Sequence, residues 1–156
     1  MDEVFRPTKD ARLISSVSLT LSIFPLLLVY FLFREDPQSV LSLQGAFLIF
    51  FPVFTFVLEI MIRKSFIRIN DKFLSGRVLF LEIKIGWDEV LAVRAIHNEY
   101  YPQKFTFLII KTSNKNHKIS LKIFDGKSIW KIILAKSREL GLDIGVIWID
   151  KPVEED

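Results

Sequence analysis

The chain begins with two long apolar segments and then changes to an alternating pattern. Leu13 to Phe33 and Val40 to Leu58 contain no charged residue. Each run reaches the roughly 18 to 20 residues that a helix needs to cross a bilayer. The pattern therefore predicts a membrane helical hairpin, with spans at 13–33 and 40–62 joined by a short turn. Pro25 and Pro52 lie inside the two runs, where a missing backbone N–H predicts a kink in each helix.

Basic residues flank both runs and predict the orientation of the hairpin. They are concentrated before the first run and after the second: Arg6, Lys9, Arg12, Arg63, Lys64 and Arg68, against Arg34 alone in the turn. Cytoplasmic flanks carry the excess of Lys and Arg. We expect a multi-pass protein of the cell (inner) membrane with both termini in the cytoplasm. A cleaved signal peptide is disfavoured, because the first run is longer than a signal core and no small-x-small cleavage pattern follows it.

From Phe66 the apolar residues alternate with polar ones. Leu81, Ile83 and Ile85 are separated by charged residues, which is the period-two pattern of a half-buried strand. The pattern returns at 119–123, whereas Phe105 to Ile110 is almost wholly apolar and is expected to be covered on both faces. Short Asn-rich stretches supply turns. The segment predicts a meander of antiparallel strands.

One helix follows the strands. Asp125 is the predicted N-cap, apolar residues recur at helical spacing, and Gly141 stands where a left-handed residue ends a helix. Its apolar stripe needs the sheet as a partner. Val146 to Ile149 could add a short strand, and the acidic tail 150–156 is predicted to be disordered. The chain thus divides into a cytoplasmic segment 1–12, the hairpin, and a cytoplasmic domain at 66–149.

Composition agrees with this division. The hydrophobic fraction of 51% exceeds what one soluble core of 156 residues would bury. The absence of cysteine agrees with a cytosolic domain. It also excludes zinc sites with thiolate ligands and cysteine nucleophiles. The net charge of +3 gives no argument for binding nucleic acid.

The segment IKIGWDEV, residues 83–90, carries a resemblance to known proteins. Ile85-Gly86-Trp87-Asp88-Glu89-Val90 resembles the strand-end element I-x-W-x-E-V/I of bacterial membrane-anchored proteins with a pleckstrin-homology-like (bacterial PH) domain, and 66–72 resembles the opening strand and turn of that domain. Most members, including the type with two transmembrane helices, are uncharacterised. The resemblance covers roughly 66–140, together with the hairpin in general arrangement.

The resemblance implies a fold and a class of function. The fold would be an α+β domain: a PH-like strand meander forming a partly open barrel or sandwich, capped by one C-terminal helix. Trp87 and Val90 would be core anchors, and Asp88 and Glu89 would occupy an exposed corner. PH-like folds generally bind lipids or proteins without catalysis. No binding residue of the family can be carried over to this chain.

Motifs for catalysis and cofactors are missing from the sequence. It contains no G-x-S-x-G element and no phosphate-binding glycine motif. His97, Glu99 and His117 could be considered as metal ligands, but a zinc site needs three or four ligands at defined spacing, and solvated strand positions are the favoured interpretation. We expect no catalytic residue, metal or cofactor.

Glu59 is an ionisable residue near the end of the second apolar run. Such residues in membrane segments often have a function in coupling or transport. Arg63 lies four residues further on, at the spacing of a helical ion pair. A pair at the membrane interface is the favoured interpretation.

Lysines form the candidate contact surface of the domain. They lie around a predicted turn and on the predicted helix: Lys111, Lys115, Lys118, Lys122, Lys127 and Lys131. A basic loop close to an anionic leaflet gains about 1 kcal/mol per residue. A solvated basic face and a membrane contact are both consistent with the pattern.

Three functions are consistent with the sequence. The first is a membrane-anchored, non-catalytic binding or scaffolding module that presents the domain to a protein partner. The second is a module that senses anionic lipid headgroups through its lysines. The third is a small accessory subunit of a membrane transporter, in which Glu59 and the hairpin would do the work.

Overall fold

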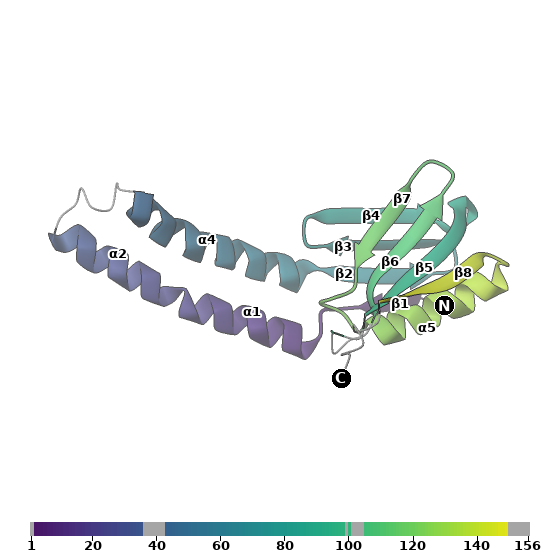
Figure 1. Cartoon of the computed structure of the whole chain (residues 1–156), viewed down its shortest axis with the longest axis horizontal. Helices are drawn as coiled ribbons and strands as arrows, with labels where there is room; N and C mark the ends of the chain where they lie inside the picture. Colours follow the sequence, from purple (N-terminus) through teal and green to yellow (C-terminus); the bar gives the residue numbers. More distant parts are fainter. Residues whose placement is uncertain (1, 36–42, 99, 101–104, 150–156) are drawn as a thin grey trace, which may run out of the picture. The chain divides into compact units, whose positions relative to one another are not determined.

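A computed structural model describes residues 2–35, 43–98, 100 and 105–149 of the chain. It divides into two compact units, a helical unit of Lys9–Lys64 and a domain formed by 2–8 together with 65–149. Each unit has its own architecture (Figure 1). The predicted tail at 150–156 and Glu99 lie outside the described residues.

The helical unit contains α1 (Lys9–Leu21), α2 (Ile23–Glu35) and α4 (Leu43–Lys64). Its first helical stretch, Lys9–Glu35, is interrupted at Ser22, one turn before Pro25, where a proline ring crowds the preceding carbonyls. Ser22 Oγ donates to the Leu19 carbonyl at 2.6 Å. By contrast, α4 continues through Pro52, and Thr55 Oγ1 donates to the Pro52 carbonyl at 2.9 Å.

The predicted spans differ in how far the structure describes them. Lys9–Glu35 is long and apolar enough, by length and composition, to cross a membrane, and no second helix meets that standard within the described residues. The predicted second span, 40–62, begins in residues outside the described part. It therefore stays a prediction.

The domain is α+β, with two four-stranded sheets and a helix. The first sheet has the order β1 (Asp2–Phe5), β2 (Phe66–Asn70), β3 (Phe73–Val78) and β4 (Leu81–Gly86), all antiparallel. The second has the order β7 (Asn116–Ser120), β6 (Phe105–Thr112), β5 (Val90–Asn98) and β8 (Asp143–Ile149). A single 3-10 turn, Trp87–Glu89, joins the sheets. The helix α5 (Gly126–Glu139) follows β7.

One hydrophobic core lies between the sheets and α5. Alternate residues of the strands point into it, including Ile67, Leu74 and Ile85 from the first sheet and Val93 and Leu108 from the second. The helix contributes its apolar stripe through Ile129, Trp130 and Ile133. The predicted α+β domain of strand sheets with a helix is confirmed, and its arrangement is compatible with the expected PH-like fold.

Several predicted boundaries change. The segment 1–12 is not separate from the domain, because Asp2–Phe5 pairs with β2 and Arg68 binds the Asp2 carboxylate through two hydrogen bonds. The meander is not wholly antiparallel, because β8 pairs in parallel with β5 and is longer than predicted. Ser75-Gly76, a dipeptide that often marks a turn, lies inside β3.

Two predicted strand patterns were partly wrong. β7 ends at Ser120, and the chain then turns so that Leu121 and Phe124 enter the core. Along β6 one face is buried, through Thr106, Leu108 and Ile110, while Phe107 and Ile109 on the other face are half-buried. An apolar run therefore does not always have two covered faces.

Both ends of α5 follow the sequence signals. Asp125 Oδ1 accepts the backbone N–H of Ser128 at 3.1 Å, and Asp125 Oδ2 accepts its hydroxyl at 2.6 Å. At the other end Gly141 has φ of +65°, and Leu142 N–H donates to the Ser137 carbonyl at 2.9 Å. This is the Schellman arrangement that a C-terminal glycine permits.

The Asp125 cap predicts a dependence of stability on pH. The hydrogen bonds from Ser128 lower the pKa of Asp125 below its usual 3.8. A carboxyl with a depressed folded pKa contributes stability that is present above the unfolded pKa and lost as pH falls through the folded one. We expect Asp125→Ala to lower the free energy of unfolding by about 1 kcal/mol at pH 7 and by less below pH of about 3.5. Urea unfolding monitored by pulse proteolysis measures this. Asp125→Asn, which keeps an acceptor that does not titrate, is the control.

Candidate functional site

The hairpin between β3 and β4 has an unusual tip, formed by Leu79, Phe80 and Leu81. Its two-residue turn places Leu79 at φ of +54°, a region that favours glycine or asparagine. Phe80 is 63% exposed and Leu81 62%. A bulky residue in this conformation costs about 1 to 3 kcal/mol, and such strain is concentrated at functional sites. The residues of this tip are therefore neither the types that favour such a turn nor the types that favour contact with water.

An apolar groove lies behind the hairpin tip. Its walls come from both sheets, with Ile83 and the tip on one side and Phe107 and Ile119 on the other. Lys118 and Ser120 are the polar residues that line it. The groove of about 370 Å³ is large enough for a side chain or part of an acyl chain. It joins the exposed tip to the outer face of the second sheet.

Two lysines stand over the aromatic ring at the edge of this groove. Lys118 Nζ lies 4.4 Å from the centroid of the Phe107 ring, and Lys122 Nζ lies 5.3 Å from it. Both side chains are exposed. A ring face stabilises a cation at these distances. The arrangement holds positive charge beside an apolar surface.

The same part of the domain holds both of its connections to the helices. Leu79 N–H donates to Ser65 Oγ at 3.0 Å, and Ser65 directly follows Lys64, the last residue of α4. Thr8 N–H donates to the Ile123 carbonyl at 2.9 Å, and Thr8 directly precedes Lys9, the first residue of α1. The hairpin tip and Lys122 therefore lie next to the residues where the domain meets the helical chain.

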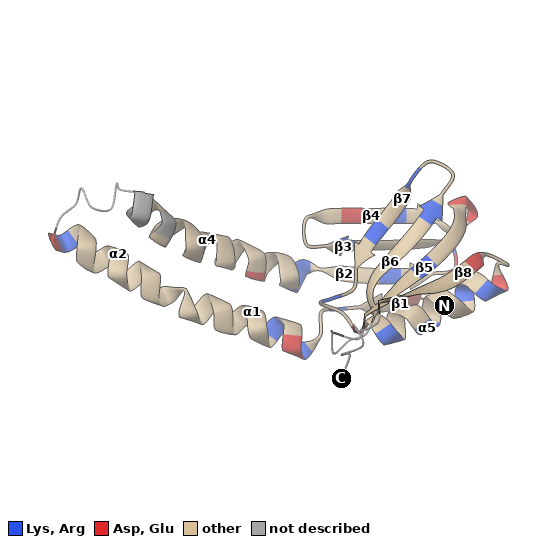
Figure 2. Ribbon diagram, viewed as in Figure 1, with Lys and Arg blue, Asp and Glu red and all other residues tan. Residues whose placement is uncertain are grey.

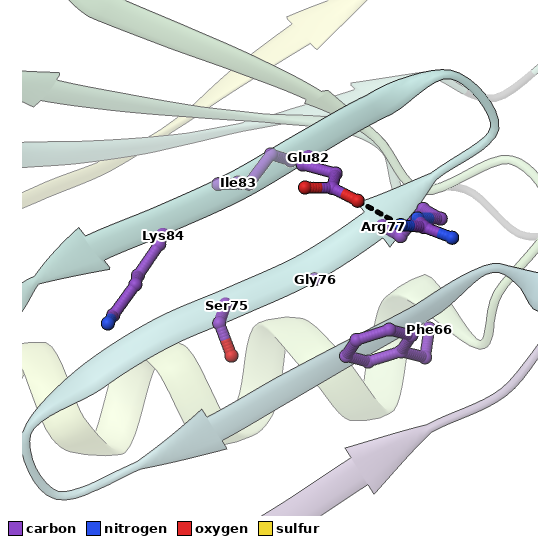
Figure 3. Close-up of a pocket in the computed structure, with 7 residues that line it drawn as sticks. All are labelled: Phe66, Ser75, Gly76, Arg77, Glu82, Ile83 and Lys84. Carbon is purple, nitrogen blue, oxygen red and sulfur yellow. Dashed lines mark hydrogen bonds and ion pairs between the residues drawn. The ribbon is translucent and has the colours of Figure 1, made fainter.

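A second hollow lies on the outer face of the first sheet (Figure 3). Ser75 and Arg77 of β3 and Lys84 of β4 project from it, and the Phe66 ring of β2 lies alongside. Arg77 is paired with Glu82 across the strands. Phe66 and Arg77 are of residue types that are enriched at protein interfaces.

The six predicted lysines do not form one surface. Four of them belong to β6, β7 and their connections: Lys111, Lys115, Lys118 and Lys122. Lys111 and Lys118 point outward from neighbouring positions of the ladder, because Lys118 pairs with Ile109 and Lys111 with Asn116. Lys127 and Lys131 are exposed on α5 instead, a helix that carries several basic positions (Figure 2). Of the six, Lys118 and Lys122 have the distinctive environment over Phe107.

The motif of residues 87–90 forms the corner between the sheets. Trp87 and Val90 are buried, while Asp88 and Glu89 are exposed. Trp87 Nε1–H donates to the Asn70 carbonyl at 2.8 Å, and its backbone N–H donates to the Lys72 carbonyl at 3.1 Å. These contacts give the motif a structural role.

Glu59 lies inside the helical unit and not on its surface. The residue is 4% exposed, its Oε1 accepts Arg63 Nε at 2.5 Å, and Ser16 Oγ of α1 donates to the same oxygen at 3.1 Å. Arg63 Nη2 donates to Ser16 Oγ at 3.3 Å. The ion pair at helical spacing therefore also connects α4 to α1, which supports a structural role for Glu59.

The histidines are far from forming a metal site. His97 is buried, contrary to the prediction of a solvated position, because it follows Val93 and Ala95 on the inward face of β5. It packs against Phe105 and Trp148, with ring centroids 5.1 and 4.2 Å away. His117 is on β7, and β6 separates these two strands. Among the described residues no group of three or more His, Asp or Glu could hold a metal ion.

Comparisons with known proteins give no assignment. No family model matches the chain, and no curated protein or solved structure is significantly similar to it. Its function has to be inferred from the two units themselves.

The hairpin tip could hardly be recognised from sequence patterns. Apolar Leu79, Phe80 and Leu81 continue the hydrophobic pattern and contain no Gly, Asn, Asp or Pro to mark a turn. The absence of turn residues is itself informative, because the conformation of a tight hairpin does not account for two leucines and a phenylalanine at its tip.

Proposed function

We propose that the chain is a non-catalytic binding module, anchored in the cell membrane by two helices, that presents a PH-like domain at the cytoplasmic face to a protein partner. The helical hairpin would be the anchor, with spans at 13–33 and 40–62. The domain of 2–8 and 65–149 would be the binding unit.

The distribution of polarity within the helical unit carries this proposal. Its exposed surface is lined by large apolar side chains, including Leu13, Phe24, Phe31, Phe50 and Phe54. Polar side chains are buried between the helices: Ser22, Thr55 and Glu59. A water-soluble helical hairpin would have the opposite arrangement, whereas lipid favours apolar groups outside and paired polar groups inside.

The positions of charged residues support an orientation with the domain in the cytoplasm. Among the described residues of the helical unit, they lie at its ends and in the Glu59–Arg63 pair (Figure 2). Lys9, Arg12, Arg63 and Lys64 belong to the ends that continue into the domain. An excess of cations at these ends favours a cytoplasmic location for the domain.

The short connections support an anchored domain. Ser65 alone separates α4 from β2, and residues 6–8 alone separate β1 from α1. Two connections this short limit the domain to the immediate surface of the membrane, since each residue spans at most about 3.5 Å. The two sheets, the Trp87 corner and the C-terminal helix are compatible with the PH-like resemblance.

The anchor is tested by spin labels at two neighbouring positions of α4. The chain has no cysteine, so Phe54→Cys and Thr55→Cys each give a unique label. Phe54 is 48% exposed and Thr55 7%. In liposomes we expect the Phe54→Cys label to be accessible to oxygen and not to a water-soluble nickel complex, and the Thr55→Cys label to be shielded from both. Access of the nickel complex to the Phe54→Cys label would refute the anchor.

The protein partner is tested at the hollow of the first sheet. A photo-crosslinking amino acid at Ser75 is expected to capture one specific protein in cells, and the same group at the exposed Ala135 of α5 is the control. Equal and unspecific products at both positions would refute a partner at this hollow.

A further inference from the structure

We propose that the hairpin tip of Leu79, Phe80 and Leu81 inserts into the surface of an anionic bilayer, with Lys118 and Lys122 binding the lipid phosphates. This inference rests on the proposed membrane anchor. It assigns to the domain a second, non-covalent attachment beyond its two chain connections.

The apolar side chains of the tip account for insertion. Phe80 and Leu81 are largely exposed at the end of a tight hairpin, and the groove behind them is mostly apolar. Aromatic side chains favour the boundary between headgroups and acyl chains. Burial in that layer would remove the apolar surface of Phe80 and Leu81 from water, which the fold itself does not do.

The charges beside the tip account for the preference for anionic lipid. Lys118 and Lys122 lie over Phe107 at the edge of the same groove. Glu82, the acidic residue next to Leu81, is paired with Arg77. Each lysine close to an anionic surface contributes about a fivefold gain in binding.

The covalent chain accounts for the position of the tip. Ser65 Oγ accepts the Leu79 N–H, and the Cα atom of Ser65 is about 3.8 Å from that of Lys64 across one peptide bond. If α4 ends at the membrane surface, the tip lies within a few residue lengths of that surface. A free domain would have to find the bilayer by diffusion, whereas this tip is held beside it.

A single fluorophore on the full-length chain tests the inference. Phe80→Cys carries an environment-sensitive dye in liposomes of phosphatidylcholine with or without phosphatidylglycerol, and lipids with a quencher on the acyl chain report insertion. Leu91→Cys is the matched control. Leu91 is 53% exposed, but it lies near the start of β5, beyond the far end of β4, whereas the tip is at the beginning of β4 with Leu81. Six strand residues of about 3.4 Å each separate the two ends of β4.

The expected result is quenching of the Phe80→Cys dye, stronger with phosphatidylglycerol, and no quenching of the Leu91→Cys dye. Adding Lys118→Gln and Lys122→Gln should shift the docking equilibrium of the tip by about 25-fold toward the undocked state. A Phe80→Cys dye quenched no more than the Leu91→Cys dye would refute insertion. Quenching that is independent of phosphatidylglycerol and of both lysines would refute the role of anionic lipid. Release of the protein by alkaline carbonate would refute the anchor itself, and the inference with it.

Discussion

Trp87→Ala is expected to lower the free energy of unfolding of the domain by about 3 to 5 kcal/mol, the usual cost of removing a buried large aromatic side chain. The ring is 5% exposed at the corner where the first sheet passes into the second. The substitution also leaves the Asn70 carbonyl without its indole donor. Pulse proteolysis in urea, with the full-length chain in lipid nanodiscs, measures the midpoint of unfolding.

Trp148→Ala is the matched control for this prediction. Trp148 is 59% exposed on the edge strand β8 and packs against His97, so its loss should cost less than that of Trp87, no more than about 2 kcal/mol. Equal shifts of the two midpoints would contradict the structural role of the motif at 87–90.

Gly76→Ala is the second substitution with a large expected effect. A Cβ atom at this position would lie 2.5 Å from the Phe66 carbonyl oxygen and 3.2 Å from Ile67 Cα, both on the neighbouring strand β2. These are backbone atoms, so β2 and β3 would have to separate. We expect a loss of about 1 to 3 kcal/mol, the usual cost of overpacking.

Ser75→Ala tests whether the Gly76 effect is steric. Ser75 is half-buried, occupies the adjacent position of β3 and projects from the outer face (Figure 3). Its substitution should change stability by less than about 0.5 kcal/mol in the same assay. A Gly76→Ala protein as stable as the Ser75→Ala protein would show that the strands can accommodate a methyl group here.

Local patterns predicted the elements whose signals lie within a few residues. Asp125 and Gly141 predicted the two ends of α5, because helix capping depends on residues within one turn of each end. Alternation identified β4, whereas the exposed corner at Asp88 and Glu89 was expected from the resemblance to PH-like proteins. Such interactions are local, so the sequence carries them directly.

Pairing between distant segments could not be predicted in the same way. Asp2–Phe5 has too short a pattern to read as a strand, and only the edge of β2 at Phe66–Asn70 gives it a partner. β8 likewise depends on the free edge of β5. A sheet edge must be covered or protected, but the sequence does not say which segment covers it.

The candidate site was the least predictable part. A hydrophobic pattern treats Phe80 and Leu81 as core residues, whereas the structure exposes both. Charge counting treats six lysines as equivalent, whereas the fold brings Lys118 and Lys122 to Phe107 and leaves Lys127 and Lys131 on α5. Exposure and juxtaposition are properties of the fold, not of spacing.

Labelling of single cysteines on intact cells tests the central claim, a hairpin that crosses the membrane twice and leaves the domain in the cytoplasm. Glu35→Cys, at the end of α2, should react with a membrane-impermeant maleimide from outside. Leu91→Cys, on the domain, should react only after lysis. Protection of Glu35→Cys in intact cells, or labelling of Leu91→Cys there, would contradict the proposed anchor.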